Sequence, residues 1–571
     1  MVRRGWSRVA GVAATFAGVA WAGAAAASSG LDSPDSGVVQ MGRGSAWLAR
    51  ADDPLAVFFN PAAMAFQASG VHVGAQLLMA NRCYTRLGLP AQGATVGTPV
   101  APDTAGGAPA PLLPGQAQPG PQYAGDKTVL PADQVCAPAT PFPVPQIAAV
   151  FRVASNAAVG IALVTPHSAG ASSWGESIGY TNSLGFGVTE PSPQRYMLVS
   201  SSALLVNPTV SVAYAPTENL SFGAGFIWGV GTLDFVTFSE SISTPTPGIT
   251  PTDHSGGDVK AELKGKDLFI PGIVLSGLWM PTSNLDVAGW FKWQDALKAS
   301  TDLTLTSLYW NANGTPNTTP CVGAAANCNL TQANGAGTVK LQIPMEAKLG
   351  LRFHLPRKEV TDAPGWSTRP GRKVRDPMSQ DIFDVEVDFT YANNSAVQNL
   401  QLGFNPGIGI KGTPSGTQVP VNGDIPYNWK DVFGVRLGGD VVAVPNVLSV
   451  RAGGFYETKG QDDQYLSLAF DLAQKLGLSA GATVRLGPVD ISAAFAHTFY
   501  GTLNNGGNGK VYALSGDTSG THSQNGQPAV CGPDPKNPAI GPGCFRSYQP
   551  INGGILTQSL NEVGLSGTVR Y

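Results

Sequence analysis

The sequence predicts an all-β fold: a transmembrane antiparallel β-barrel of about fourteen strands whose lumen is plugged by a small N-terminal hatch of short helices. Three observations support this prediction. Only 13% of the 571 residues are charged, and the chain contains 71 glycines and 45 prolines, whereas soluble domains carry about a quarter charged residues. From about residue 70, apolar residues alternate with glycine, serine and threonine, as in strands that face lipid on one side and a polar lumen on the other. Short and long connections also alternate along the chain.

Composition and charge exclude several other classes of protein. A hydrophobic content of 43% is too high for a disordered acidic or lysine-rich chain. The net charge of −3 lacks the basic surface of a nucleic-acid-binding protein. Outside the N-terminus there is no run of 18 or more apolar residues, which excludes a multi-helix membrane protein. We therefore expect no nucleic-acid partner.

Residues 1–27 have the features of a secretory signal peptide. Arg3, Arg4 and Arg8 precede an apolar stretch of small residues, and residues 25–27 offer an A-x-A cleavage site. The alternative is an uncleaved membrane anchor, but no stop-transfer cluster of charges follows the stretch. We therefore expect export of the mature chain into an oxidising compartment.

Residues 28–69 do not alternate and form the expected hatch. Asp52 or Asp53 would cap a helix that has Pro54 at its first position. The pair Asn60–Pro61 would end this helix, because a residue before proline avoids the α region. A compact segment of this kind, with two phenylalanines, fits inside a barrel better than in its wall.

Residues 70–571 form the expected barrel with long extracellular loops. The last strand alternates Val563, Leu565 and Val569 with glycine, serine and threonine, and it ends on Tyr571. A C-terminal aromatic residue of this kind resembles the signal that the barrel assembly machinery recognises. If the strands are numbered in chain order, the connections from an even-numbered strand to the next strand are mostly short, and those from an odd-numbered strand to the next are long. The basic segment 357–375 is an exception, because its place in this order puts it on the short, periplasmic side. Strands are expected to start near residues 70, 146, 157, 204, 219, 262, 285, 341, 381, 431, 447, 478, 488 and 562.

The six cysteines fall along the sequence as three close pairs within the long connections. They show neither C-x-x-C spacing nor histidine partners at zinc spacing. In an oxidising compartment this pattern favours disulfides that staple loops. The pairs are Cys83 with Cys136, Cys321 with Cys328, and Cys531 with Cys544, although spacing alone leaves the connectivity open.

Alternation also predicts which charged residues face the lumen. Both signs occur there on successive strands, as expected for a paired ladder inside the barrel, where an unpaired charge is costly. One interpretation is a structural network that anchors the hatch; the other gives one or two of the basic residues a role in holding a carboxylate ligand. The charged residues concerned are Glu346, Lys348, Arg352, Asp384, Glu386, Asp388, Arg436, Asp440, Arg451, Arg485 and Arg570, with Arg43, Arg50, Asp52 and Asp53 in the hatch.

The fifth and sixth strands are apolar on both faces. Phe222, Phe226 and Trp228 are prominent on the fifth strand. If these bulky side chains point inward, they either line an apolar path through the lumen or pack against the hatch.

No enzyme motif is found in the sequence. The Ser-x-x-Lys, G-x-S-x-G and H-E-x-x-H motifs are absent, and none of the six histidines has metal-ligand spacing. We therefore expect no enzyme activity, no metal and no cofactor. An outer-membrane lipid hydrolase would need a Ser/His pair facing lipid, and His497 is the one strand histidine that merits a test.

Several motifs resemble those of the FadL-type outer-membrane transporters of long-chain fatty acids and aromatic hydrocarbons. The most specific is Val57-Phe58-Phe59-Asn60-Pro61-Ala62. The resemblance implies a fourteen-stranded barrel, a hatch in the lumen, capture of hydrophobic ligand at the outer face, binding beside the hatch, and passive lateral release through a break in the third strand. Weaker matches are residues 42–46, 51–53, 425–431, 435–438, 450–454 and 478–481.

The resemblance and the alternation together give candidate site residues in a monomer surrounded by outer-membrane lipid. Pro166, which lacks a ladder donor, is a candidate for interrupting the third strand. The alternatives are an aromatic hydrocarbon channel of the same type, a structural or adhesive barrel, and a lipid hydrolase. Candidate ligand contacts are Phe58, Phe59, Asn60, Pro61, Met64, Phe226, Trp228, Arg352, Arg436 and Arg451, and candidate hatch anchors are Arg43, Arg50, Asp52, Asp53, Asp384, Glu386 and Asp388.

Overall fold

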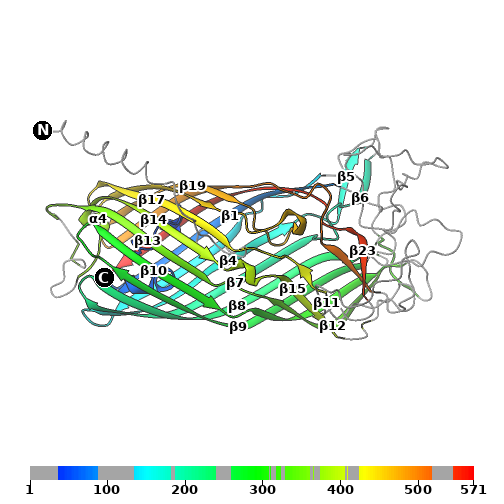
Figure 1. The fold of residues 1–571 in the computed structure, drawn as a ribbon, viewed down its shortest axis with the longest axis horizontal. Helices are drawn as coiled ribbons and strands as arrows, with labels where there is room; N and C mark the ends of the chain where they lie inside the picture. Colours follow the sequence, from blue (N-terminus) through cyan, green and yellow to red (C-terminus); the bar gives the residue numbers. More distant parts are fainter. Residues whose placement is uncertain are drawn as a thin grey trace.

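The chain folds as a closed antiparallel barrel with a small segment inside its lumen (Figure 1). The computed structural model describes residues 37–87, 134–181, 187–239, 259–307, 309, 317–322, 328–360, 364–365, 373–405, 408, 423–516 and 544–571. The expected signal peptide at residues 1–27 therefore lies outside the described residues. None of the helices in the described part is long and apolar enough to cross a bilayer.

Fourteen wall strands make up the barrel, several of them in two pieces. The last wall strand pairs with the first along its whole length, from Gly70↔Arg570 to Arg86↔Gly554, which closes the wall. In chain order the wall contains β1 (Gly70–Arg86), β2 (Gln134–Ala137) with β3 (Phe142–Arg152), β4 (Ala157–Ser173), β7 (Ser200–Thr217), β8 (Leu220–Ser239), β9 (Val259–Trp279), β10 (Leu285–Gln294) with β11 (Leu297–Ser307), β12 (Leu330–Leu341) with β13 (Glu346–Pro356), β14 (Asp381–Ala392) with β15 (Asn399–Phe404), β16 (Ile425–Pro426) with β17 (Val432–Val444), β18 (Leu448–Glu457), β19 (Lys475–Leu486), β20 (Val489–Tyr500) with β21 (Leu503–Asn504), and β24 (Gly554–Arg570).

Exposure alternates along the wall strands as the sequence predicts. On β24, Leu565 is 62% exposed whereas its neighbour Ser566 is 5% exposed. The outer surface is therefore built from large apolar side chains, and the polar and charged ones turn inward. This arrangement suits a wall that faces lipid.

The two ends of the barrel differ in their connections. Short turns such as 153–156 and 445–447 lie at the end that carries the C-terminus and α4 (Pro377–Gln380) (Figure 1). We call this the short-turn end, and the opposite end the long-loop end. The long-loop end carries two hairpins outside the wall sheet, β5 (Ser177–Thr181) with β6 (Gly187–Pro191), and β22 (Tyr512–Gly516) with β23 (Cys544–Pro550).

The hatch consists of short helical turns: α2 (Val38–Met41), α3 (Ala56–Phe59) and the 3-10 helix η1 (Pro61–Phe66). The predicted start of the second helix is wrong, because Leu55 is its N-cap residue. Asp53 instead accepts a hydrogen bond from the Leu55 amide at 2.8 Å within the preceding turn. The helix ends before Asn60, as the Asn60–Pro61 pair predicts.

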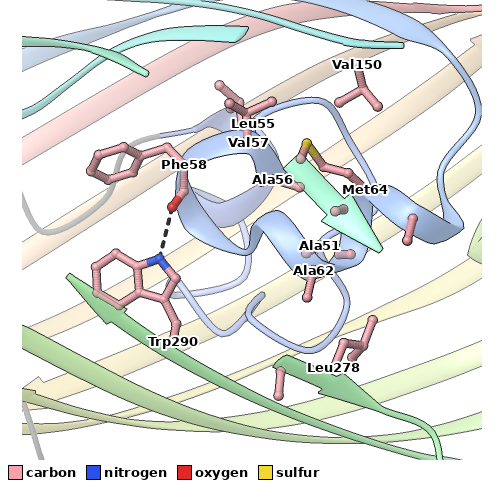
Figure 2. Close-up of a cluster of buried hydrophobic side chains, with 14 of the residues drawn as sticks. Ala51, Leu55, Ala56, Val57, Phe58, Ala62, Met64, Val150, Leu278 and Trp290 are labelled. Atoms are coloured by element: carbon pink, nitrogen blue, oxygen red, sulfur yellow. Dashed lines mark hydrogen bonds between the residues drawn. The ribbon is translucent and has the colours of Figure 1, made fainter. Parts of the chain in front are cut away.

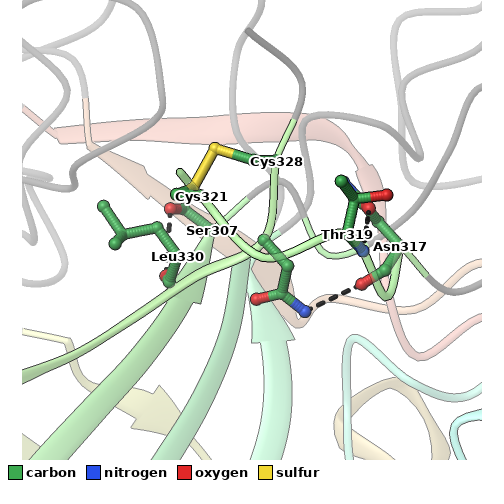
Figure 3. Close-up of a disulfide and its surroundings, with 7 residues drawn as sticks. Ser307, Asn317, Thr319, Cys321, Cys328 and Leu330 are labelled. Carbon is green, nitrogen blue, oxygen red and sulfur yellow. Dashed lines mark hydrogen bonds between the residues drawn. A yellow bond between two sulfur atoms is a disulfide. The ribbon is translucent and has the colours of Figure 1, made fainter. Parts of the chain in front are cut away.

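Two disulfides occur among the described residues. Cys83 lies opposite Cys136 in the β1–β2 register, and Cys321 is bonded to Cys328 beside the start of β12 (Figure 3). The second disulfide lies near a hydrogen bond from the Ser307 hydroxyl to the Leu330 carbonyl. The third predicted pair, Cys531 with Cys544, lies outside the described side chains.

Candidate ligand site and hatch

Carboxylates on β14 hold the hatch backbone. Asp388 accepts hydrogen bonds from the amides of Trp47 and Leu48 at 3.0 and 3.1 Å. Glu386 accepts from the next two amides, those of Ala49 and Arg50. Four successive hatch amides thus bond to two buried carboxylates of one strand, which fixes the position of this turn in the lumen.

Arg43 and Arg50 extend this contact to the side chains. Arg43 pairs with Asp384 at 2.7 Å, with Asp440 at 2.5 Å and with Glu386 at 3.4 Å. Arg50 pairs with Asp384 at 2.5 Å and Asp440 at 3.3 Å. The structure thus brings together six of the seven candidate hatch anchors, because Asp52 joins the group through Arg50 at 3.0 Å.

Asp53 is the seventh candidate anchor and has a different environment. Its side chain is buried, and its second oxygen finds no hydrogen-bond partner among the described residues. Burial and the neighbouring Asp52 carboxylate raise the pKa of Asp53 to about 7. Asp53 therefore supports the hatch turn through the Leu55 amide and not through an ion pair.

Glycines allow the hatch to approach the wall closely. A Cβ at Gly438 would overlap the carbonyl oxygen of Arg43, and a Cβ at Gly453 would overlap the same peptide group. Gly44 has φ +59 and lies against Gly454. The turn at residues 43–44 therefore requires residues without a side chain at the facing positions of β17 and β18.

The candidate ligand contacts of the hatch lie in its apolar core (Figure 2). Phe58 and Met64 are buried there, and the Phe58 carbonyl accepts a hydrogen bond from the Trp290 indole at 2.9 Å. Pro61 is buried at the start of η1. Asn60 is buried and donates to the Leu48 carbonyl. Phe59 is partly buried and packs edge-on against Phe58.

The three candidate arginines of the wall are held in ion pairs. Arg352 pairs with Asp286 at 2.8 Å and also with Asp381 and Asp384. Arg436 pairs with Glu457 at 2.9 Å. Arg451 pairs with Asp440 at 3.2 Å and also donates to Thr483.

Phe226 and Trp228 do not line the interior, so this prediction is wrong. They are 46% and 51% exposed on the outer face of β8, while Ile227 between them is fully buried and faces inward. The prediction missed the alternation of β8, in which Ser221, Gly223, Gly225 and Gly229 occupy the face opposite to Phe226 and Trp228. These outward aromatic residues belong to the surface that suits lipid.

Lys348 is an inward-facing cation that was not among the predicted ligand contacts. Its cross-strand neighbours are Trp290 on β10 and Thr390 on β14. Its Nζ lies 4.7 Å from the Trp290 ring centroid and 6.0 Å from that of Phe59. Among the described residues no carboxylate pairs with it, since nearby Glu346 pairs with Lys292 at 2.5 Å. No signal in the sequence identifies this environment, because the cross-strand neighbours follow only from the register of the closed barrel.

An apolar pocket lies above the hatch, toward the long-loop end. The pocket is narrow and partly open to solvent. Leucines of β7, β8 and β12 line it, and Phe470 from the β18–β19 connection completes one side. Its lining has almost no polar surface, which suits a hydrocarbon. The residues that line it are Ala203, Leu204, Leu205, Thr232, Leu233, Phe235, Leu297, Val339, Leu341, Ile343, Leu400 and Phe470.

The ladder between β3 and β4 is incomplete. The two strands pair from Arg152↔Ala158 to Ile147↔Leu163, and among the described residues no pairing between them extends further. Beyond this point β4 continues on β7, with register shifts that include the position of Pro166. Pairing between β3 and β4 therefore stops just above Gly160, against which the hatch residues Val57 and Met64 pack.

A strap contacts the hatch at the short-turn end of the barrel. We define the strap as residues 373–380, which lie between β13 and β14 at the short-turn end. The Arg375 amide donates to the Phe66 carbonyl at 2.8 Å, and its guanidinium bonds Asp286 and the Ala49 carbonyl. Asp376 accepts two hydrogen bonds from Arg485 on β19. The basic segment 357–375, which is the exception to the alternation of short and long connections, therefore leads into contacts that join the hatch, β10 and β19.

The histidine considered for hydrolysis lies on the outer face. His497 Nδ1 is hydrogen-bonded to Asn561 Oδ1 at 2.7 Å. No serine hydroxyl is bonded to its ring among the described residues. The Ser/His pair that a lipid hydrolase needs is therefore not assembled there.

Comparisons with known proteins bear on the fold. No family model matches the sequence, and no curated protein matches it. The chain is similar to the solved structure of a Pseudomonas aeruginosa FadL homologue, with 17% identity and a TM-score of 0.60 over 94% of this chain and 99% of that one. It is also similar to the Pseudomonas putida toluene transporter TodX, with 12% identity and a TM-score of 0.53 over 95% of this chain and 99% of that one. The chain therefore has the FadL-type fold, a closed fourteen-stranded antiparallel barrel.

Proposed function

We propose that this protein carries hydrophobic compounds passively across the bacterial outer membrane. The observation that carries the proposal is the apolar pocket inside a barrel whose lumen is blocked below by the hatch and the strap. A compound that enters the pocket meets the hatch below it, while backbone pairing between β3 and β4 stops beside the hatch, after Ile147↔Leu163. This arrangement supports lateral release into the membrane.

The proposed orientation places the long-loop end outside the cell and the short-turn end in the periplasm. The large apolar residues on the outer face then lie in the bilayer, as in an integral outer-membrane barrel. Ligand capture occurs at the long-loop end, and the pocket lies between the capture point and the hatch. The chain acts as a monomer and, as a passive transporter, catalyses no reaction.

Lys348 favours ligands with an anionic head group. Its ammonium group is half-buried beside Trp290 and Phe59 and has no carboxylate partner among the described residues. A charge in such a place is stabilised by an incoming anion. A long-chain fatty acid supplies a carboxylate for Lys348 and a hydrocarbon chain for the pocket. Aromatic hydrocarbons, which the fold also serves in the toluene transporter, are the alternative ligand class.

We expect Lys348→Met to weaken oleate binding by about tenfold and to leave toluene binding within twofold. The factor corresponds to loss of one charge-assisted hydrogen bond, about 1.5 kcal/mol or more. The measurement is equilibrium binding of radiolabelled oleate and toluene to the purified protein. Lys348→Arg is the matched control and keeps most of the affinity, because it retains the positive charge.

The outcomes separate the ligand classes. Unchanged oleate binding in Lys348→Met would remove the role of this lysine. Toluene binding without oleate binding in the natural protein would favour the aromatic hydrocarbon alternative. If cells that produce the natural protein take up neither compound faster than cells without it, passive transport is contradicted and an adhesive or structural barrel is favoured.

A further inference from the structure

A group of lysines lies on the outer face of the wall toward the long-loop end. The strands β8, β9, β11 and β12 are neighbours there (Figure 1). Lys266 on β9, Lys298 on β11 and Lys340 on β12 are all exposed, and we call them the lysine cluster. Lys298 lies directly opposite Lys340 in the strand register. Lys266 lies opposite Ser300, which is on the same face as Lys298 and two residues from it.

The lysine cluster carries more positive charge than the carboxylates beside it compensate. Lys298 pairs with Asp295 at 2.7 Å, whereas neither Lys266 nor Lys340 forms an ion pair among the described residues. Asp267, which follows Lys266 in the chain, instead accepts hydrogen bonds from two backbone amides. Like charges directly opposite each other destabilise a sheet. An anion bound between Lys298 and Lys340 would therefore relieve an unfavourable contact.

Other acidic residues of this face lie beyond the lysine cluster, on its long-loop side. Asp234 pairs with Lys264 at 3.6 Å, and Asp302 is the cross-strand neighbour of Lys264 on β11. Since Lys264 precedes Lys266 on β9, both carboxylates lie farther from the apolar part of the wall. They compensate Lys264 and not the lysine cluster.

Hydroxyl groups complete the polar surface around Lys266. Its cross-strand neighbours are Thr232 on β8 and Ser300 on β11, and Thr338 on β12 lies opposite Ser300. These three residues are exposed. Lysine ammonium groups and Ser/Thr hydroxyl groups are common donors to phosphate oxygens. The surface therefore offers donors from four strands to an anionic head group.

An apolar shelf adjoins the lysine cluster on its short-turn side. We define the shelf as Leu268, Phe269 and Trp228, which are 61%, 50% and 51% exposed. The Trp228 ring packs edge-on against Phe269, and its indole donates to the Leu268 carbonyl at 2.9 Å. Asp267 accepts a hydrogen bond from the Phe269 amide at 3.1 Å, at a point where the β8–β9 register shifts. These contacts hold the bulky side chains of the shelf outward.

The length of β9 places the shelf at the edge of a bilayer. Trp279, at the short-turn end of β9, is 50% exposed and lies ten residues beyond Phe269. Ten residues of a strand tilted by about 40° rise about 25 Å, which is the height of the apolar band of an outer-membrane barrel. Aromatic residues flank such a band at both interfaces. The lysine cluster therefore lies just outside the band, at the level of the lipid head groups.

We infer that the lysine cluster and the apolar shelf bind a phosphorylated glycolipid of the outer leaflet, the lipid A part of lipopolysaccharide. The lysines bind a phosphate of the sugar head group, and an acyl chain lies along the shelf. Clusters of basic residues at a membrane surface bind anionic head groups. In the proposed orientation the long-loop end faces the outer leaflet, which lipopolysaccharide forms. The inference uses this orientation but goes beyond the proposed function, because the site lies outside the barrel and away from the transported ligand.

Native mass spectrometry of the purified protein with added lipid A tests the site. We expect Lys266→Gln combined with Lys340→Gln to weaken lipid A binding by about tenfold or more, because two charge-assisted contacts with phosphate are lost. Arginine at both positions keeps most of the affinity. The matched control is Lys430→Gln combined with Lys459→Gln, which removes two exposed lysines beside β17 and β18 at the same end. It changes the affinity less than about twofold, and barrel assembly of each variant is checked by heat-modifiable migration.

Equal lipid A affinity in the natural protein and in a folded Lys266→Gln/Lys340→Gln protein would overturn the inference. Equal affinity of the natural protein for lipid A and for dephosphorylated lipid A would also overturn it, because phosphate would then not be recognised. Equal affinity for phosphatidylglycerol would overturn the choice of a glycolipid. If the double variant does not fold, lipid A binding by the natural protein that is insensitive to salt would overturn the inference. Failure of the natural protein to take up oleate would count against the proposed function alone, since lipid A binding in detergent does not depend on transport.

Discussion

Arg43→Met is expected to release the hatch and turn the barrel into an ion-conducting pore. Arg43 is fully buried and pairs with Asp384, Glu386 and Asp440. Removing one partner of a buried ion pair costs about 3–5 kcal/mol, because it leaves uncompensated charge behind. A loss of this size lowers the ratio of docked to free hatch by about two to three and a half orders of magnitude. Single-channel conductance in planar bilayers measures the effect.

Arg43→Lys is the control for this experiment, since it keeps the positive charge but loses the planar guanidinium group and its paired N–H donors. We expect a conductance between those of the natural protein and Arg43→Met. An Arg43→Met protein that assembles as a barrel and stays closed would show that the ion pairs do not hold the hatch.

Gly438→Val should open the same pore by a steric route. A Cβ at this position would overlap the Arg43 carbonyl oxygen, and β17 cannot retreat without breaking its pairing with β14 and β18. The hatch must then move away from β17, while the introduced valine itself suits a strand. We expect conductance as high as that of Arg43→Met. Combining the two substitutions adds little, because each displaces the same turn.

Gly289→Val is the matched control on another wall strand, because a Cβ there meets no atom within 4 Å. We expect it to remain closed. Equal conductance in Gly289→Val and Gly438→Val would show that the leak reflects a general weakening of the wall and not displacement of the hatch.

Alternation predicted the inward charges well because a strand places every second residue on the same face. Asp384, Glu386 and Asp388 all turn inward and contact the hatch or its arginines. The same rule also places Phe226 and Trp228 outward, because Gly223, Gly225 and Gly229 occupy the opposite face of the strand; the prediction of inward ligand contacts overlooked this alternation. The family resemblance suggested a break in the third strand; the β3–β4 ladder ends at Ile147↔Leu163, and the β4–β7 register shifts between Val164 and His167.

Long-range placement could not be predicted from local patterns. Lys348 looks like any other inward lysine until Trp290 and Thr390 are known to flank it. The strap likewise depends on contacts between distant segments, such as Arg375 with Asp286 and Asp376 with Arg485. These pairings follow from how the barrel closes, and a single sequence carries no signal for them.

The route of release is tested most directly by locking the floor of the barrel. Ala68 and Val374 pack together where the strap meets the hatch, so cysteines at both positions can join the two with a disulfide. Uptake of radiolabelled oleate is measured for the oxidised double variant in cells, and the reduced form of the same protein is the control. Lateral release predicts equal uptake by both forms, because the ligand never passes the strap. Loss of uptake on oxidation, restored on reduction, would show that the ligand leaves through the floor and would contradict the account.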